Sequence, residues 1–569
     1  MIPIALLLAL QAPALRPVSS DSGDPPGRVA RLSVREGRLS FQPSGDTVAG
    51  SWSDVAVNYI LTSGDRLYAD QDSRAELEAG DCTVRLGAAT DLTIANLTDD
   101  FFQLSMSSGT LRVTVYDLSR GDSIEVDTPN GAFLLRRAGA YRVAVSDADS
   151  TTTISVDSGL ADVVAGDVLQ SVQGGGALQL AGSDPIRVAS VAPPAADDFD
   201  RWSAGRDQPL AASASAQYVG RNVPGYEELD RAGQWETAPE YGPVWYPTVV
   251  AVDWQPYRAG HWAWIDPWGW TWVDDAPWGY APFHYGRWVY WHDRWAWAPG
   301  RRVERPCYAP ALVVFVSVGS GGVQGWFPLG PREPYHPWYH HGPDYRARVN
   351  VDVTVVTTRE VHYVNRPRIV AVPLDVFRGG EPVDRRVVRV TQPEITRAQI
   401  ISHPRVQPLP QTAGWGTGWS QPAAPGRPAV RRPVVARPRP EIRVTPWRDR
   451  PGAQPLRPTV EQPAPPSRPP LRPAIIPTAP GGRRVPPPVI ARNPPAPAAL
   501  PFPTRQKAMQ QTDPGRPLEP VQRQNLRQGK PAGPHRDQED PGDHRAAKKP
   551  QPPAKKPVPD KKPAPPGRE

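Results

Sequence analysis

The chain has 569 residues, including 74 prolines, 20 tryptophans and only two cysteines, Cys82 and Cys307. So few cysteines exclude a small secreted scaffold held together by disulfides. The formal net charge of +7 is unevenly distributed, because residues 401–569 carry 30 Lys and Arg against 11 Asp and Glu and contain 43 of the prolines. The chain is therefore an acidic body, residues 1–400, followed by a cationic, proline-rich tail.

The N-terminus has the pattern of a signal peptide. A short apolar run ends at Leu10 and is followed by Ala12-Pro13-Ala14, which fits the small-residue motif of a cleavage site. A buried strand or an irregular N-terminus is the alternative for this segment. The longest later apolar run, residues 311–318, is far shorter than the ~20 residues that span a bilayer. We therefore predict a signal peptide over residues 1–14 and a periplasmic or extracellular protein without a helical membrane anchor.

Residues 28–182 are predicted to form one β domain. Apolar and polar residues alternate in short segments separated by Gly, Asp and Asn turns, with no helical pattern between them. Such an arrangement is typical of a sandwich, a barrel or a rolled sheet. The clearest predicted strands are residues 83–86, 111–116, 141–145 and 153–156.

The same stretch resembles the FecR-type domain. The matching segments, in order, are residues 61–67, 73–77, 84–87, 104–111, 124–131, 141–143 and 153–159. The resemblance implies an all-β, jelly-roll-like domain that faces the periplasm or the outside. Signal-transducing members of that family carry a membrane helix upstream, where this chain has the expected leader. FecR-type signal transduction is therefore an alternative function and not the first.

A predicted linker, residues 183–217, is rich in Ala, Ser, Pro and Asp and precedes a tryptophan-rich region. Twelve of the 20 tryptophans lie between Trp245 and Trp297, where Pro-Trp-Gly-aromatic recurs at positions 267 and 277. These turns predict short β-hairpins. Their tryptophans could form the core of a small β domain or an exposed face that stacks on sugar rings. Four of them alternate with smaller residues: Trp262, Trp264, Trp270 and Trp272.

This second region, residues 218–366, resembles a Trp- and Pro-rich domain of unknown function found after FecR-type domains in exported proteobacterial proteins. The matching segments are residues 225–230, 241–245, 254–262, 278–288, 326–333 and 363–366. The resemblance implies no catalytic residues. Residues 367–400 are predicted to be a transition segment between this domain and the tail.

A binding site is predicted around His284, Arg287 and Trp288, together with the four alternating tryptophans. Imidazole and guanidinium groups beside aromatic rings suit an anionic or hydroxyl-rich ligand. We expect no metal at His336, His340 and His341, because the prolines around them oppose a helix that would align these side chains. Residues 317–322 are predicted to form a hairpin turn and not a phosphate-binding loop.

No catalytic motif occurs in its expected context, so we predict a protein that is not an enzyme and has no cofactor. The Asp274-Asp275 pair is expected to be solvated at a turn, and a disulfide between Cys82 and Cys307 is not favoured because they lie in separate predicted domains. A glycan-acting enzyme that uses Asp274, Asp275 or His284 is the weakest alternative.

The tail, residues 401–569, is expected to be disordered, since only one aromatic residue follows Trp447. It could be a soluble, extended spacer or an electrostatic tether to anionic polymers. Peptidoglycan, lipopolysaccharide or an envelope protein are the predicted partners, whereas nucleic acid is not expected because aromatic interleaving is missing. The sequence thus predicts an exported, non-catalytic envelope scaffold that engages protein or glycan.

Overall fold

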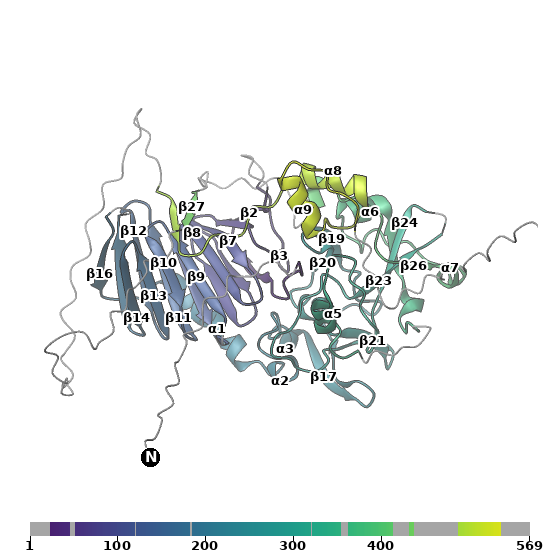
Figure 1. Ribbon diagram of the computed structural model, residues 1–569. Helices are drawn as coiled ribbons and strands as arrows, with labels where there is room; N and C mark the ends of the chain where they lie inside the picture. Colours follow the sequence, from purple (N-terminus) through teal and green to yellow (C-terminus); the bar gives the residue numbers. More distant parts are fainter. Residues whose placement is uncertain are drawn as a thin grey trace, which may run out of the picture.

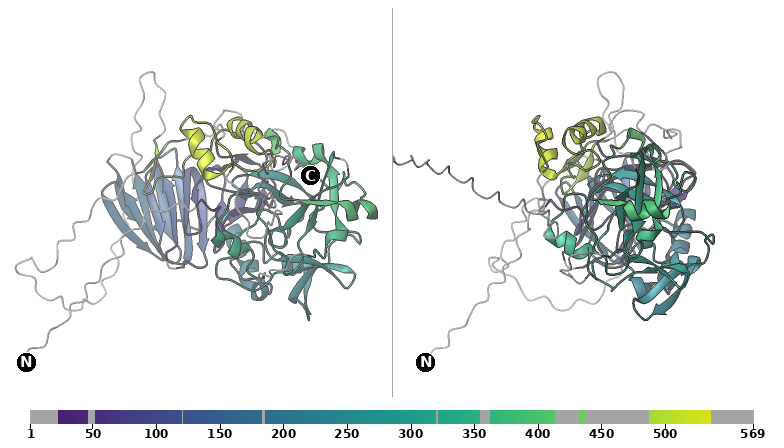
Figure 2. Two further views of the ribbon diagram at one scale, coloured as in Figure 1. Left: turned by 45° about the vertical axis from the view of Figure 1, so that its right-hand side comes forward. Right: turned by 90° about the vertical axis from the view of Figure 1, so that its right-hand side faces the viewer.

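The computed structural model describes residues 23–45, 52–119, 121–182, 185–319, 321–353, 362–412, 432–436 and 487–535. The protein is mainly β, as predicted, and two β-rich parts lie side by side (Figures 1 and 2). The predicted signal peptide, residues 1–14, lies outside the described residues. Within them, no helix is both long enough and apolar enough to cross a bilayer.

The first part consists of two sheets that share one long strand, β8. One sheet has the strand order β3-β1-β5-β6-β8-β11-β12-β15-β16, and the other has the order β2-β4-β7-β8-β9-β10-β13-β14. The strands are β1 (Ala30–Glu36), β2 (Leu39–Gln42), β3 (Ile60–Leu61), β4 (Arg66–Ala69), β5 (Arg74–Glu78), β6 (Cys82–Leu86), β7 (Thr90–Leu97), β8 (Phe101–Val115), β9 (Ser123–Thr128), β10 (Gly131–Leu135), β11 (Gly139–Ser146), β12 (Thr151–Val156), β13 (Leu160–Ala165), β14 (Val168–Gln173), β15 (Gly176–Ala181) and β16 (Arg187–Val191). The four clearest predicted strands are confirmed as β6, β8, β11 and β12.

Strand β8 crosses from one sheet to the other at Gly109. Residues 101–108 pair with β7 and β9, whereas residues 109–115 pair with β6 and β11. Gly109 has a φ of +90°, and a Cβ atom at this position would collide with the Cα of Thr90. Only glycine combines this backbone conformation with so close an approach.

The predicted linker, residues 183–217, is largely structured. It contains strand β16 and helix α1 (Asp198–Ala212), which begins with a capping box formed by Asp197 and Asp200. Ion pairs hold the helix against the first sheet, with Arg112 to Asp200 at 2.6 Å and Arg206 to Glu76 at 2.7 Å. Only two residues of α1 are buried. The helix therefore lacks the apolar stripe from which an amphipathic helix is predicted.

The second part contains two four-stranded sheets, β17-β18-β22-β21 and β25-β24-β23-β26, and the separate hairpin β19–β20. Its strands are β17 (Gly233–Ala238), β18 (Gly242–Pro247), β19 (Gly260–Ile265), β20 (Gly269–Asp274), β21 (Arg287–Trp291), β22 (Arg294–Ala298), β23 (Val313–Ser317), β24 (Val323–Pro328), β25 (Val370–Pro373) and β26 (Gln399–Ile401). Its helices are α2 (Ala216–Val219), α3 (Leu229–Ala232), α4 (Ala281–His284), α5 (Pro343–Val349), α6 (Leu374–Gly379) and α7 (Gln392–Arg397), with 3₁₀ turns at Arg366–Arg368 and Pro410–Thr412.

The predicted hairpins of the tryptophan-rich region are confirmed as β19–β20 and β21–β22. Strands β23 and β24 also form a hairpin, which confirms that residues 317–322 connect two paired strands. The predicted transition segment, residues 367–400, is instead part of this fold. It supplies β25 and most of β26, the two outer strands of one sheet.

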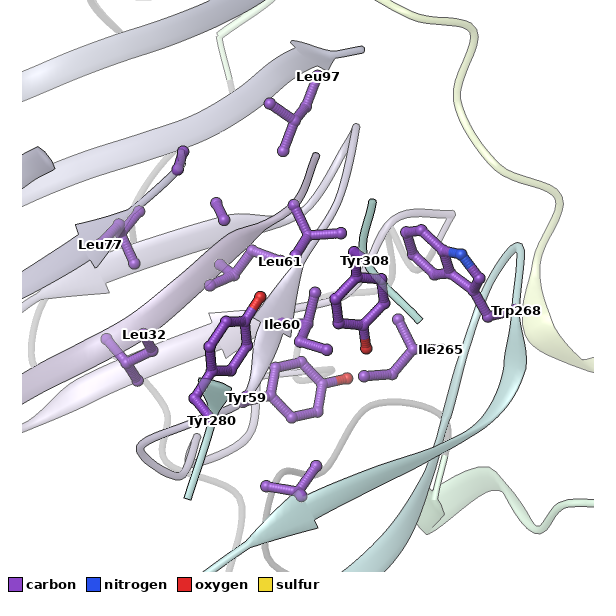
Figure 3. Packing of buried hydrophobic residues seen from close by; sticks show 14 of the residues in the cluster. Leu32, Tyr59, Ile60, Leu61, Leu77, Leu97, Ile265, Trp268, Tyr280 and Tyr308 are labelled. Atoms are coloured by element: carbon purple, nitrogen blue, oxygen red, sulfur yellow. The ribbon is translucent and has the colours of Figure 1, made fainter. Parts of the chain in front are cut away.

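The two parts share one continuous hydrophobic core. Figure 3 shows Tyr59 and Ile60 of the first part beside Ile265, Tyr280 and Tyr308 of the second. Polar bonds accompany this packing across the same boundary. The side-chain amide of Asn58 donates to the backbone carbonyls of residues 274 and 276 at 3.0 and 2.8 Å.

Part of the predicted tail is folded onto both parts. Residues 487–535, which we call the C-terminal strap, contain β28 (Val489–Ala491), α8 (Phe502–Thr512) and α9 (Pro520–Arg527); β28 pairs with the short strand β27 (Val434–Ala436) and with β9 (Figure 1). Phe502, Met509 and Leu518 are buried, and Arg505 forms an ion pair with Asp266. The strap therefore differs from the disordered tail predicted over residues 401–569, most of whose other residues lie outside the described ranges.

Candidate functional site

The four tryptophans of hairpin β19–β20 lie in the core. Trp262 faces Trp272 and Trp264 faces Trp270 across the hairpin, and the rings of each pair meet edge-to-face with centroids 5.5 Å apart. Residues two apart on a strand share a face, so all four side chains project to one side. Each is at most 2% exposed. Of the two interpretations of these residues, the aromatic core is therefore confirmed, and the alternative of an exposed, sugar-stacking face is wrong.

Trp288 is a buried residue that positions a neighbouring helix. It is 1% exposed, and its indole Nε1 donates to the backbone carbonyl of Pro282 at 2.8 Å. Pro282 belongs to α4, whose last residue is His284. Trp288 thus fixes the helix that carries His284 and offers no ring face to a ligand.

His284 presents an unused hydrogen-bond acceptor. Its Nδ1 lies 2.8 Å from the backbone carbonyl oxygen of Ala309, and because a carbonyl only accepts hydrogen bonds, Nδ1 carries the ring proton. Burial lowers the pKa of His284 to about 3, so the ring is neutral at physiological pH. Its Nε2 is therefore an acceptor, and it is buried without a hydrogen-bond donor among the described residues.

Arg287 is a buried cation held by neutral groups. Its guanidinium donates to the backbone carbonyls of Gly286 and Glu333 and to the side-chain oxygen of Asn350, at 2.8, 3.2 and 3.1 Å. The Glu333 carboxylate is engaged elsewhere, where it accepts hydrogen bonds from two backbone amides. Burial lowers the pKa of Arg287 to about 10, which still leaves it protonated at neutral pH. A buried positive charge without a paired carboxylate is costly unless an anion accompanies it.

His284 and Arg287 line one cavity of about 310 Å³. This volume lies at the lower end of the ~300–1,000 Å³ range of small-molecule sites. The lining carries two carboxylates, those of Glu240 and Asp352, against four arginines. The other residues of the lining include three arginines and two aromatic residues: Arg301, Arg332, Arg348, Tyr285 and Trp297.

The structure brings together two of the predicted site residues and separates the others. His284 and Arg287 share the cavity, whereas the predicted tryptophans, including Trp288, do not line it. The three additional arginines were missed because they lie up to about 60 residues further along the chain, Arg301 and Arg332 in loops and Arg348 in helix α5. The Arg301-Arg302 pair directly after Gly300 is the one signal in the sequence that could have indicated a basic lining.

Asp274, another side chain in this region that could be reactive, is held by hydrogen bonds within the fold. Asp274 is buried and accepts hydrogen bonds from the Trp272 indole and the Ala276 amide, each at 3.0 Å, so the expectation of a solvated pair holds only for Asp275. Asp274 does not line the cavity that holds His284.

Cys307 lines the cavity, but burial raises the pKa of its thiol to about 12, so the thiol stays protonated at neutral pH. Both cysteines are free, as expected. Across the ranges that the structure describes, no group of three or more His, Cys, Asp or Glu side chains is arranged to hold a metal ion.

One region of the chain matches a known protein family. Residues 226–333 match a family of unknown function, DUF6600. The match lies within the predicted Trp-rich domain, residues 218–366, and contains His284 and Arg287. No protein with a curated description matches the chain.

Two crystal structures of a proposed anti-sigma factor from Parabacteroides distasonis are similar to part of the chain. They are 16% and 15% identical to it, each with a TM-score of 0.21, and the similarity covers 23% of this chain. The chain spans about 60% of the length of those proteins. At this TM-score the likeness shows neither a shared fold nor a shared function.

Proposed function

We propose that this chain is an exported, non-catalytic protein of the bacterial envelope that binds a glycan or a protein of that compartment. One observation supports binding above all, namely the cavity in the DUF6600 region, whose lining has four arginines against two carboxylates and includes the cation of Arg287 without a paired carboxylate. A cation without a paired carboxylate is costly to bury, and a complementary anionic ligand would offset that cost.

A non-catalytic role is supported by the acid–base properties of the same cavity. An imidazole with a pKa near 3 is a weak base, and a thiol with a pKa near 12 is a poor nucleophile at neutral pH. The continuous core across both parts favours a rigid scaffold in which the cavity is held in shape.

We also propose that residues 28–182 form a FecR-type domain, which the two-sheet fold of β1–β15 supports. Signalling through a membrane-embedded partner remains the alternative function on that ground. Crosslinking in cells separates the two, because the signalling function requires that a membrane protein be recovered and the scaffold function does not.

A direct test combines fractionation with a pull-down. The full chain should be found in the periplasm or medium, and purified peptidoglycan or lipopolysaccharide should retain it at low salt. Recovery of the mature chain in the cytosol, or equal recovery on an uncharged cellulose control, would contradict the proposal.

A further inference from the structure

The turn between α8 and α9 of the C-terminal strap is packed directly on the second part. Gly515 in this turn has a φ of +84°, and a Cβ atom there would lie 1.9 Å from the carbonyl oxygen of Pro404 and 2.8 Å from the backbone nitrogen of Val406. Side chains on either side of this contact therefore face one another across the seam between the strap and the second part.

His403 joins the second part to the strap across this seam. The residue is 5% exposed, and its Nε2 lies 3.2 Å from a carboxylate oxygen of Asp513. A carboxylate only accepts hydrogen bonds, so Nε2 carries the ring proton and donates it. The other nitrogen, Nδ1, lies 3.0 Å from the hydroxyl of Ser402, which donates to it. The neutral ring thus uses both of its nitrogens.

His535 is the corresponding residue at the far end of the strap. Its Nδ1 lies 3.3 Å from a carboxylate oxygen of Glu519, the residue that caps the start of α9. Its Nε2 is buried and has no hydrogen-bond partner among the described residues. Protonation of the ring would place a second N–H group at this position, where none of the described residues accepts it.

The charges around the two rings are balanced while the rings are neutral. The groups that face them are two carboxylates and two guanidinium groups: Asp513, Glu519, Arg405 and Arg516. A third histidine of the second part, His340, faces the same Glu519 and Arg516 as well as Asp24 and Arg523. Protonation of His403 and His535 would therefore add two positive charges to a buried group that has no carboxylate to spare.

We propose that His403 and His535, with Asp513 and Glu519, form a pH-sensitive latch that holds the strap closed at neutral pH and releases α8 and α9 at mildly acidic pH. The strap covers the turn of hairpin β19–β20, where Arg505 pairs with Asp266. Release would uncover this turn of the tryptophan-rich region. The latch is independent of what the cavity binds.

The direction of the pH dependence follows from burial. Burial is the largest influence on both rings and lowers their pKa, Arg516 acts in the same direction, and the two carboxylates oppose it. In a released strap the rings return to a pKa of about 6.5. The released state therefore binds more protons as the pH falls below that value, and the closed state loses stability. Buried carboxyl groups with a raised pKa, such as Asp127 of β9, act in the opposite direction.

Hydrogen exchange followed by mass spectrometry tests this latch on the full chain at pH 7.5 and pH 5.0, with rates corrected for the intrinsic effect of pH. The protection of α8 should fall by at least about tenfold at pH 5.0, because each ring contributes up to about 30-fold. Strand β8 should keep its protection. Unchanged protection of α8 would overturn the latch, and so would an equal loss in β8, which would indicate acid unfolding of the whole protein.

The wild-type chain also reports the number of protons involved. Between pH 6 and pH 5, the slope of the logarithm of α8 protection against pH should correspond to the uptake of at least about one proton per opening. A smaller uptake would overturn the latch.

Variants assign the effect to the two histidines. In the double variant His403→Gln, His535→Gln, each glutamine keeps an N–H donor and does not titrate. Its α8 should be equally protected at both pH values to within about threefold, whereas His362→Gln, at an exposed position, should follow wild type. A tenfold loss of protection that persists in the double variant would overturn the assignment. If the double variant is already unprotected at pH 7.5, the wild-type proton uptake decides.

Discussion

Glu227 is a buried carboxyl group at the boundary between the two parts, and its replacement by glutamine should stabilise the protein at neutral pH. Glu227 is 5% exposed, and neither of its side-chain oxygens accepts a hydrogen bond from another described residue. The neighbouring cation, Arg31, is already shared by Glu78 and Glu228 at 3.3 and 2.6 Å. Arg206 lies 3.9 Å from Glu227 but only 2.7 Å from Glu76.

Burial, and then the charges of Glu78 and Glu228, raise the pKa of Glu227 well above its usual range. The folded protein therefore holds a proton that the unfolded chain releases above its ordinary pKa of about 4.3. As the pH rises from there, the unfolded state gains stability relative to the folded state, by about 1.4 kcal/mol per pH unit for one group. Between pH 5 and pH 7 this loss is roughly 3 kcal/mol.

Glu227→Gln removes the titrating proton while it keeps the shape of the neutral side chain. Urea unfolding at pH 4.5 should give equal free energies of unfolding for wild type and variant. At pH 7 the variant should be the more stable by roughly 3 kcal/mol. Glu304→Gln, at an exposed position, is the control and should follow wild type at both values.

The reasoning would be refuted by a Glu227→Gln variant that is less stable than wild type at pH 7, because Glu227 would then be ionised and paired in the folded state. Glu228, whose pKa burial raises to about 7, contributes a pH dependence of the same sign. Some loss of stability between pH 5 and 7 should therefore persist in the variant.

Three further substitutions are judged by the free energy of unfolding in urea. Met509→Ala in the strap should lower the free energy of unfolding by about 2–5 kcal/mol, because Met509 is buried. The control, Val521→Ala, at a position 43% exposed, should change that free energy by no more than about 0.5 kcal/mol. Equal effects of the two substitutions would show that the strap is not packed. Gly109→Ala should cost at least about 1–3 kcal/mol because of its positive φ and its approach to strand β7. Arg31→Met should cost about 3–5 kcal/mol because it leaves buried carboxylates unpaired, and a neutral result would show that they are solvated.

The strands of residues 28–182 and the hairpins of the tryptophan-rich region were predictable because each of these strands carries its own signal in the sequence, which β16, β25 and β26 do not. Alternation located the strands of the first part, and Pro-Trp-Gly turns located hairpin β19–β20. The position of the tryptophans was not fixed by alternation alone. Trp262 and Trp264 share one face of their strand, but whether that face meets solvent or core depends on what packs on it, here partly the aromatic rings of β24 and α6.

The cavity, helix α1 and the strap were not predictable for a common reason: each depends on contacts between distant segments. Helix α1 is held by ion pairs to strands up to about 130 residues away. The strap binds the first part through Asn493, whose side chain and backbone amide donate to the buried carboxylate of Glu125. Composition indicated disorder there, because a proline-rich segment with one phenylalanine has little to bury by itself. It folds against surfaces that the rest of the chain provides.

The strap also changes how the electrostatic tether should be tested. A chain that ends at residue 400 would lose Phe502 and Met509, which are part of the core. Weaker binding of that chain to the cell wall would therefore have two causes, the lost positive charge and the lost packing.

Most of the cationic excess lies before the strap, since residues 413–486 carry 13 Lys and Arg against 3 Asp and Glu. Replacement of the arginines in residues 437–484 by glutamine therefore removes charge and leaves the strap intact. If the tail is a tether, this variant should lose most binding to purified peptidoglycan at low salt while its unfolding midpoint stays unchanged, and wild-type binding should fall steeply with salt. Wild-type binding that is insensitive to salt, or equal retention of the variant, would assign wall contact to the folded parts instead.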